Sequence, residues 1–350
     1  MKKHYPSIQI LRAVLFLFVL AFHCGVPYAN FGWGGIEAFF VISVFFLVRK
    51  CWGSATLSVK QQVCHRIARL YPPYLAVLVV AALYALLMKA IPFDLVTHLL
   101  SAQNFQWMVT GYQSAMQPMT AHTWTLSIEI WDGLVWLLLL KCLSKNRFKN
   151  AMFGFLIVGI LYRVVTIICG ADVWVVSLCP IAHFDAFACG SLLAIAIKEE
   201  KVDGRISIPG FVGIAGITGC IAWMSNSNNI GFVGAYQLLS SSKNYLNNWF
   251  TGNIYLFISL LTTGLVGLLY IHDEKKLRKA GKVEQAFVRL GDNSYTLYLF
   301  HWPVFAVLKR LVHHRGAIVL LTFIVSVVAA MIFNWFYAIL QKRHLGGKIS

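Results

Sequence analysis

Long apolar runs separated by short polar or basic segments make up most of the chain. An α-helix needs about 20 largely apolar residues to cross the roughly 30 Å hydrocarbon core of a bilayer. We therefore predict an all-α integral membrane protein with about ten transmembrane helices. No polar segment is long enough to form a domain of its own, so we expect a single membrane domain over residues 1–350. The predicted spans cover residues 8–28, 33–48, 72–90, 124–142, 151–169, 181–197, 209–224, 253–272, 294–312 and 316–339.

Basic residues predict which side of the membrane each connecting segment faces, because short cytoplasmic loops are enriched in Lys and Arg. With the N-terminus in the cytoplasm, most of the 30 Lys and Arg residues fall in inside segments. Both termini are therefore predicted to be cytoplasmic, and we expect a multi-pass protein of the cell (inner or cytoplasmic) membrane. The outside segments contain Lys89, Lys243, Lys309, Arg310 and Arg315.

Composition agrees with this assignment. Hydrophobic residues make up 59% of the chain and charged residues 12%, with a mean hydropathy of +0.69, whereas a soluble domain carries about 25% charged residues. The net charge of +17 could suit nucleic acid, but basic loops on the inside are expected to attract anionic membrane lipids instead. The eight cysteines show no metal-binding spacing, so we expect no metal. The first apolar run is expected to remain as a membrane anchor, because no small-residue cleavage site follows it.

Three ionisable residues, Arg12, His23 and Glu37, lie within the first two apolar runs. An ionised residue at membrane depth costs about 2.5–3.5 kcal/mol, so it usually faces a cavity or a partner. His23 and Glu37 each lie seven residues from Asn30, which predicts that both side chains sit ~10 Å below the same membrane face. Such a pair could act as a general base. Arg12 shares a helix face with His23 but lies about 16 Å nearer the other side, so we predict a slot with a cation at one end and a base at the other.

Arg66 and Arg69 precede the third predicted span and are three residues apart, hence neighbours on one helix face. Two interpretations stay open. The arginines could be snorkelling residues that only set topology. They could also form a clamp, because paired guanidinium groups offer several planar donors to a phosphorylated ligand.

The segment 91–123 is polar and contains no Lys or Arg. It would suit a neutral polar partner such as a sugar, with Trp107 and Tyr112 as stacking candidates, although a simple lid loop would look the same. Its end leads into Trp124 and Glu129.

Glu129 lies seven residues after His122 and is predicted at the depth of His23 and Glu37, so that three ionisable groups would converge. Alternatively, Glu129 and Asp132 could pair with a buried basic group such as Arg163.

The ninth predicted span contains His301 two residues before Pro303. Proline kinks a helix and frees carbonyl groups, so we expect His301 to line the internal cavity; a core histidine bonded to a carbonyl is the alternative. Together with Trp124 and Glu129, His301 is a candidate for lining the cavity or contacting an acceptor.

Six motifs stand in order along nearly the whole chain: Leu11-Arg12 with Phe22-His23, and residues 34–43 (GGIEAFFVIS), 66–72 (RIARLYP), 124–129 (WTLSIE), 187–194 (FACGSLLA) and 294–303 (SYTLYLFHWP). Together they resemble the acyltransferase-3 family of integral membrane O-acyltransferases. The resemblance implies about ten membrane helices and transfer of an acyl group, often acetyl, to a hydroxyl of a polysaccharide, lipid-linked glycan or similar acceptor. The implied donor is acyl-CoA, such as acetyl-CoA, which arrives from the cytoplasm as a co-substrate, with no bound cofactor.

The resemblance also implies site residues. The family's essential arginine, histidine and acid correspond to Arg12, His23 and Glu37, and its basic pair corresponds to Arg66 and Arg69. The chain departs from the family at Val44, where glycine is usual, at Ile130, where an acid is common, and at His183, where arginine is frequent. The soluble esterase-like domain that some members append is expected to be absent.

These observations give one leading hypothesis and two competitors. Arg12, Arg66 and Arg69 would hold the acyl-CoA. In the direct route His23, oriented by Glu37, removes a proton from the acceptor hydroxyl; in a two-step route His23 carries the acyl group itself.

A secondary transporter or flippase would also explain intramembrane Arg, His and Glu, but the two halves show no matching broken helices. A glycan-binding scaffold would leave the arginine pair without a ligand. The sequence contains no Gly-rich phosphate loop, HExxH or GxSxG motif, which excludes the commonest ATPase, metalloprotease and serine-hydrolase classes.

Overall fold

The structure, a computed structural model, describes residues 5–54, 57–90, 94–200, 204–275 and 281–346. Every regular element among these residues is helical, which confirms the predicted all-α class. Some residues that contribute to the predicted charge pattern lie outside the described part of the chain, namely Lys2, Lys3, Lys201, Lys276, Arg278, Lys279 and Lys348.

Within the described residues, each of the ten predicted spans overlaps one long helix. These helices are α1 (Pro6–His23), α2 (Gly34–Cys51), α3 (Val59–Leu87), α7 (Trp124–Cys142), α8 (Lys145–Ile168), α10 (Phe184–Lys198), α11 (Ile208–Ser227), α14 (Ile254–Lys275), α16 (Ser294–Leu311) and α17 (Arg315–Gly346). Shorter helices connect them: α4 (Leu95–Leu99), α5 (Gln103–Thr110), α6 (Gln117–Thr120), α9 (Val173–Leu178), α12 (Phe232–Leu238), α13 (Ser242–Tyr245) and α15 (Lys282–Asp292). The 3₁₀ turns η1 (Ala121–Thr123), η2 (Pro180–His183), η3 (Gly204–Ser207) and η4 (Thr251–Asn253) precede α7, α10, α11 and α14.

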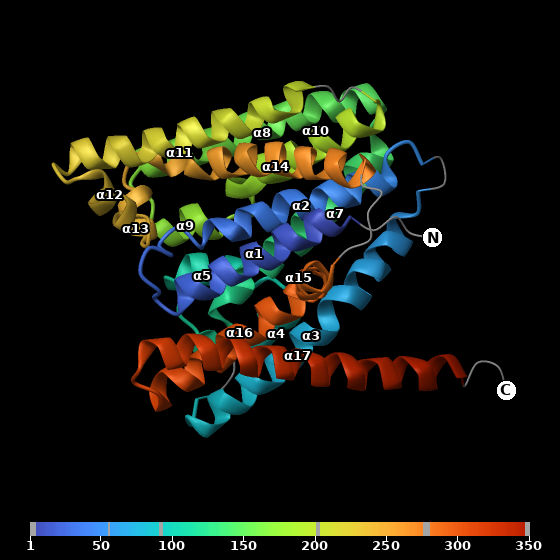
Figure 1. Cartoon of the computed structure of the whole chain (residues 1–350), viewed down its shortest axis with the longest axis vertical. Coiled ribbons are helices and arrows are strands. Elements are labelled where there is room, and N and C mark those ends of the chain that lie inside the picture. The colour runs from blue at the N-terminus through green and yellow to red at the C-terminus, as the bar shows by residue number, and fades with distance from the viewer. Residues whose placement is uncertain (1–4, 55–56, 91–93, 201–203, 276–280, 347–350) are drawn as a thin grey trace.

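The long helices form three groups (Figure 1). Helices α8, α10, α11 and α14 lie together at the top of the view, α1, α2 and α7 lie in the middle, and α16, α17 and the inclined α3 lie below. Helix α2 packs against α10 and α14, and α1 packs against α2, α15 and α16. Within these central helices Glu37 is buried, and Arg12 and His23 are half-buried.

Seven helices of the described part are long and apolar enough to cross a membrane: α1, α3, α8, α10 with its preceding turn, α11, α14 and α17. Their outer faces expose large apolar side chains such as Ile157, Phe211 and Trp335. Apolar faces of this extent are covered by lipid in membrane proteins, so the chain is a multi-pass membrane protein. Helices α2, α7 and α16 are not among these seven, and the ten-span topology with cytoplasmic termini stays a prediction.

Helix α1 ends at His23, before the predicted boundary at residue 28, and residues 24–33 form turns. The turn is pressed against α1 at Gly32, where an added Cβ would lie 2.3 Å from the carbonyl oxygen of Phe18. His23 therefore stands in the last turn of α1 and Glu37 in the first turn of α2. The predicted depth of both residues below the turn is wrong, because neither helix continues to Asn30.

Helix α3 begins at Val59, well before the span start predicted at Pro72. Pro72 and Pro73 lie inside this helix. Proline commonly disrupts a helix interior. The structure continues the helix through them, which places Arg66 and Arg69 on the same helix as the prolines, about two turns and one turn before Pro72.

Candidate active site

A cavity of about 700 Å³ lies between α1, α2, α3, α7, α16 and α17. Its charged and polar lining includes Arg12, His65, Arg69, Glu129 and Asp292. One end is open, because His65 and Gln341 are exposed, whereas Thr125, Tyr298 and Leu299 at the other end are buried. The volume falls within the range of about 300–1,000 Å³ that is typical of small-molecule sites.

The arginine pair contacts Glu129, but the two arginines differ. Arg66 is largely buried: its Nη2 donates to the carbonyl oxygen of Glu129 at 2.8 Å and lies 3.4 Å from Oε1. A Cβ on Gly133 would be 2.6 Å from that guanidinium group, so Arg66 fills a closely fitted place on α7. The side chain of Arg69 is 63% exposed, contacts Glu129 Oε1 at 3.5 Å and lines the cavity. Arg69 is therefore the member of the pair that a ligand can reach.

Glu129 takes its partners from both sides of the cavity. Ser43 on α2 donates to Glu129 Oε1 at 2.8 Å, opposite the two arginines of α3. The alternative in which Glu129 pairs with a buried basic group is therefore confirmed, but the group is Arg66 and not Arg163. The predicted convergence of Glu129 with His23 and Glu37 is also wrong, because the partners of these three groups lie on different helices.

His23 contacts His301 rather than Glu37. The distance from His23 Nδ1 to His301 Nε2 is 2.8 Å, and the two rings are nearly parallel. His301 is fully buried, and its Nδ1 donates to the carbonyl oxygen of Tyr298. Among the described residues, neither His23 nor His301 lines the cavity, but Tyr298 and Thr125 do. Tyr298 thus connects the cavity wall to the pair His23–His301 through its bond to His301.

The motif around Pro303 explains this arrangement. Proline has no backbone N–H, so the carbonyl of Leu299, four residues earlier, loses its helical partner. His122 Nε2 lies 2.9 Å from that oxygen, and the hydroxyl of Tyr298 donates to the carbonyl oxygen of His122 at 2.8 Å. The prediction that Pro303 frees a carbonyl is confirmed, and the freed group attaches the segment before α7 to α16.

Glu37 is bonded to a different histidine. Its Oε2 lies 2.8 Å from His183 Nδ1, and His183 Nε2 donates to the carbonyl oxygen of Ser177 at 2.9 Å. Both residues are buried, and Glu37 does not line the cavity formed by the described residues. The predicted pair of His23 with Glu37 is therefore wrong: α2 packs mainly on α10, so Glu37 faces the start of α10. His183, the residue that departs from the family pattern, is its partner.

Arg163 forms a buried ion pair with Asp185. Its Nη2 contacts Asp185 Oδ2 at 2.8 Å and Asn253 Oδ1 at 3.0 Å, and all three side chains are buried. The pair connects α8, α10 and the turn before α14. Arg163 holds the fold and has no contact with the cavity.

Trp124 lies beside this region rather than in the cavity. Its ring packs at 5.6 Å from His183, and its carbonyl oxygen accepts from Asn104 at 3.0 Å. Among the sequence candidates for the cavity wall, Glu129 therefore lines the cavity, whereas Trp124 and His301 stand behind it.

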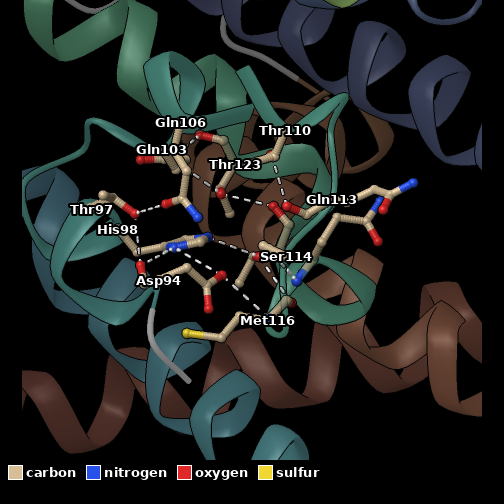
Figure 2. Close-up of polar contacts among 12 residues, drawn as sticks. Asp94, Thr97, His98, Gln103, Gln106, Thr110, Gln113, Ser114, Met116 and Thr123 are labelled. Atoms are coloured by element: carbon tan, nitrogen blue, oxygen red, sulfur yellow. Dashed lines mark hydrogen bonds and ion pairs between the residues drawn. The ribbon is translucent and has the colours of Figure 1, made fainter. Parts of the chain in front are cut away.

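The segment leading to α7 folds into a polar cluster of its own (Figure 2). Gln103 donates to the carbonyl oxygen of Thr123 at 2.9 Å, and His98 contacts the Asp94 carbonyl and the Thr120 hydroxyl. Burial lowers the pKa of His98 below its ordinary value, so the imidazole is neutral near pH 7. The network fixes the segment against the start of α7.

The aromatic residues proposed to stack on a sugar contact the protein instead. Trp107 is fully buried between the rings of His98 and Tyr112. Tyr112 stacks on Trp174 at 4.5 Å. Trp107 as a sugar platform is therefore wrong, because the segment uses its large apolar side chains for its own small core.

The contrast between the arginines predicts different results for their variants. If acyl-CoA is the donor, as the motifs imply, Arg69→Gln should raise the donor KM about tenfold, because a hydrogen bond to a charged group contributes about 1.5–3 kcal/mol and Arg69 is exposed. Arg66→Gln should instead lower the Tm, because Glu129 loses its buried partner. Lys60→Gln, on the same helix and exposed, is the matched control and should change neither quantity. Unchanged donor KM in Arg69→Gln would leave Arg69 with a topological role alone.

The Glu37–His183 contact predicts that an uncharged side chain at position 37 keeps the protein folded and active, provided that it can form a hydrogen bond with His183. His183 Nε2 donates to a carbonyl, so a neutral His183 accepts at Nδ1, and the amide of Glu37→Gln can donate there. We expect Glu37→Gln to keep the wild-type kcat, whereas Glu37→Ala should lose about 1–3 kcal/mol of unfolding free energy. Thermal unfolding and kcat of both variants test this. A folded Glu37→Gln protein without activity would place Glu37 in the reaction after all.

The comparisons with known proteins agree with the motifs. Residues 5–339 match the acyltransferase domain of the acyltransferase-3 family, and the chain belongs to this family. The resemblance seen in the sequence is thereby confirmed.

Curated relatives are distant in sequence. The chain is 22% identical to peptidoglycan O-acetyltransferase OatA of Listeria monocytogenes over 321 residues, which cover 87% of this chain and 50% of that protein. It is 21% identical to O-acetyltransferase OatA of Staphylococcus aureus over 325 residues, which cover 86% of this chain and 51% of that protein. The chain spans about half the length of the curated relatives it matches. No solved structure matches the chain.

Proposed function

We propose that the chain is a membrane O-acyltransferase that moves an acyl group, most simply acetyl, from cytoplasmic acyl-CoA to a hydroxyl of a cell-envelope glycan or lipid-linked sugar. Family membership supports acyl transfer. The names of the two OatA relatives support acetyl as the acyl group, and the Listeria name supports a cell-wall glycan as the acceptor.

One observation carries the proposal. The cavity extends from the exposed Arg69 to Tyr298 and Leu299, whose carbonyl groups bond two of the three clustered histidines His23, His122 and His301. Arg12 and Arg69 line it, and cationic guanidinium groups suit the phosphates of CoA. Tyr298 and Leu299 form its closed end. The carbonyl oxygen of Tyr298 accepts from His301, and that of Leu299 accepts from His122. A thioester that extends along the cavity would therefore reach the neighbourhood of His23.

The reaction follows from this placement. His23 would accept the proton of the acceptor hydroxyl as the hydroxyl oxygen attacks the thioester carbonyl carbon. The carbon–sulfur bond then breaks, and the CoA sulfur takes the proton from His23. In the two-step route, His23 first attacks the thioester and then passes the acyl group to the hydroxyl.

The test uses purified protein in detergent with acetyl-CoA, with and without a cell-envelope glycan extract. We expect release of free CoA thiol that depends on the extract, and acetyl groups on the glycan by mass spectrometry. A burst of one equivalent of thiol without extract would favour the two-step route. A protein that releases no thiol with any envelope fraction would contradict the proposed function and favour the transporter interpretation.

A further inference from the structure

We propose that His301 is the positioning residue that decides which nitrogen of His23 is protonated, so that Nε2 of His23 is the base. This inference rests on the proposed function and deepens it. In the sequence argument the orienting group was Glu37, which the structure bonds to His183 instead.

The proton on His301 is fixed by the backbone. A carbonyl oxygen can only accept a hydrogen bond, and His301 Nδ1 contacts the carbonyl oxygen of Tyr298. His301 Nδ1 therefore carries the proton. The residue is fully buried, and no carboxylate of the described residues is found in contact with it. A second proton would place an unpaired charge in that site, which is costly. His301 Nε2 thus presents a lone pair.

The lone pair on His301 Nε2 determines the tautomer of His23. With 2.8 Å between His23 Nδ1 and His301 Nε2, one of the two nitrogens must donate. Because His301 Nε2 is the acceptor, the donor is His23 Nδ1. A neutral imidazole carries one proton, so His23 Nε2 is unprotonated and can accept one. His23 is half-buried, whereas His301 is not accessible, so of the two only His23 has surface that a substrate could contact.

Packing holds the His23 ring in the plane that this bond needs. Phe22 and Trp302 lie 5.3 Å and 4.8 Å from the His23 ring centre. The remaining histidine of the cluster, His122, donates through Nε2 to the Leu299 carbonyl and meets His301 only ring to ring, at 5.5 Å. His122 therefore holds α16 in place, and the tautomer of His23 depends on His301.

The arrangement also supports the charged intermediate. When His23 takes the acceptor proton on Nε2, it becomes an imidazolium, and its Nδ1–H bond to His301 becomes charge-assisted and stronger. The protons of His301 do not move, since its Nδ1–H stays on the Tyr298 carbonyl. The proton on His23 Nε2 then passes to the CoA sulfur, which leaves both histidines as they began.

Two variants separate positioning from packing. His301→Leu removes the acceptor, whereas the amide oxygen of His301→Gln can accept from His23 Nδ1 while its N–H donates to the Tyr298 carbonyl. In a serine-protease triad the wrong tautomer lowers kcat about 10⁴-fold, so we expect at least ~10²-fold from His301→Leu, with unchanged acetyl-CoA KM, and a loss under ~10-fold from His301→Gln. Equal kcat for the two folded variants would overturn the inference.

The tautomer of His23 can also be measured without any catalytic turnover, so that this inference is tested independently of the proposed function. In ¹⁵N-histidine NMR of the full chain in detergent, the His23 signals are those lost in His23→Gln. We expect a protonated Nδ1 and a bare Nε2 in the wild type and in His301→Gln, and loss of this preference in His301→Leu. A wild-type His23 protonated on Nε2 overturns the inference even if the enzyme is active. The expected tautomer in a protein that releases no CoA thiol supports the positioning role and rejects the proposed function.

Discussion

Replacing His23 with alanine is expected to lower kcat for acetyl transfer by about 10²- to 10⁴-fold, the usual contribution of a general base. The KM for acetyl-CoA should stay near its wild-type value, because the cavity arginines remain in place. If His23 carries the acyl group itself, the loss should be at least as large, since no intermediate can form. Release of free CoA thiol from acetyl-CoA, with an envelope glycan extract as acceptor, measures the effect.

The control is His313→Ala, which changes an exposed histidine between α16 and α17. It should keep wild-type kcat and Tm. Thermal unfolding shows whether His23→Ala is folded, which is expected because the lost bond joins only two neutral rings. A folded His23→Ala protein that transfers acetyl at the wild-type rate would remove His23 from the reaction.

The largest expected effect on stability comes from Arg163. Arg163→Met leaves the carboxylate of Asp185 and the amide of Asn253 without their partner in a fully buried site. Breaking a buried ion pair in this way costs about 3–5 kcal/mol. Unfolding of the purified protein by SDS titration, with Tm as a second measurement, should show the loss.

The matched control removes both charges. Arg163→Met combined with Asp185→Leu leaves no buried charge and should recover most of the stability that the single variant loses. The cavity is not touched by either residue, so the folded double variant should keep its KM for acetyl-CoA. A single Arg163→Met variant as stable as the wild type would show that the pair contributes little to the fold.

Much of the architecture was predictable because each membrane helix is encoded by a continuous apolar run in the sequence. The apolar runs gave the ten helical segments, and Pro303 correctly indicated a free carbonyl near His301. The spacing of Arg66 and Arg69 placed both on one helix face, and both contact Glu129. The six motifs identified the family. Helix ends were less predictable: α1 stops at His23 because the following turn packs against the helix at Gly32.

The sequence by itself determined which helices form and which polar residues must find partners within the bundle. Only the tertiary structure decided the partners: His301 for His23, 278 residues away, His183 for Glu37, and Asp185 for Arg163. The reason is physical. Periodicity fixes the position of a residue along a helix and the face it occupies, but the neighbour of that face depends on how all the helices pack, and depth in the membrane alone cannot distinguish one neighbour from another.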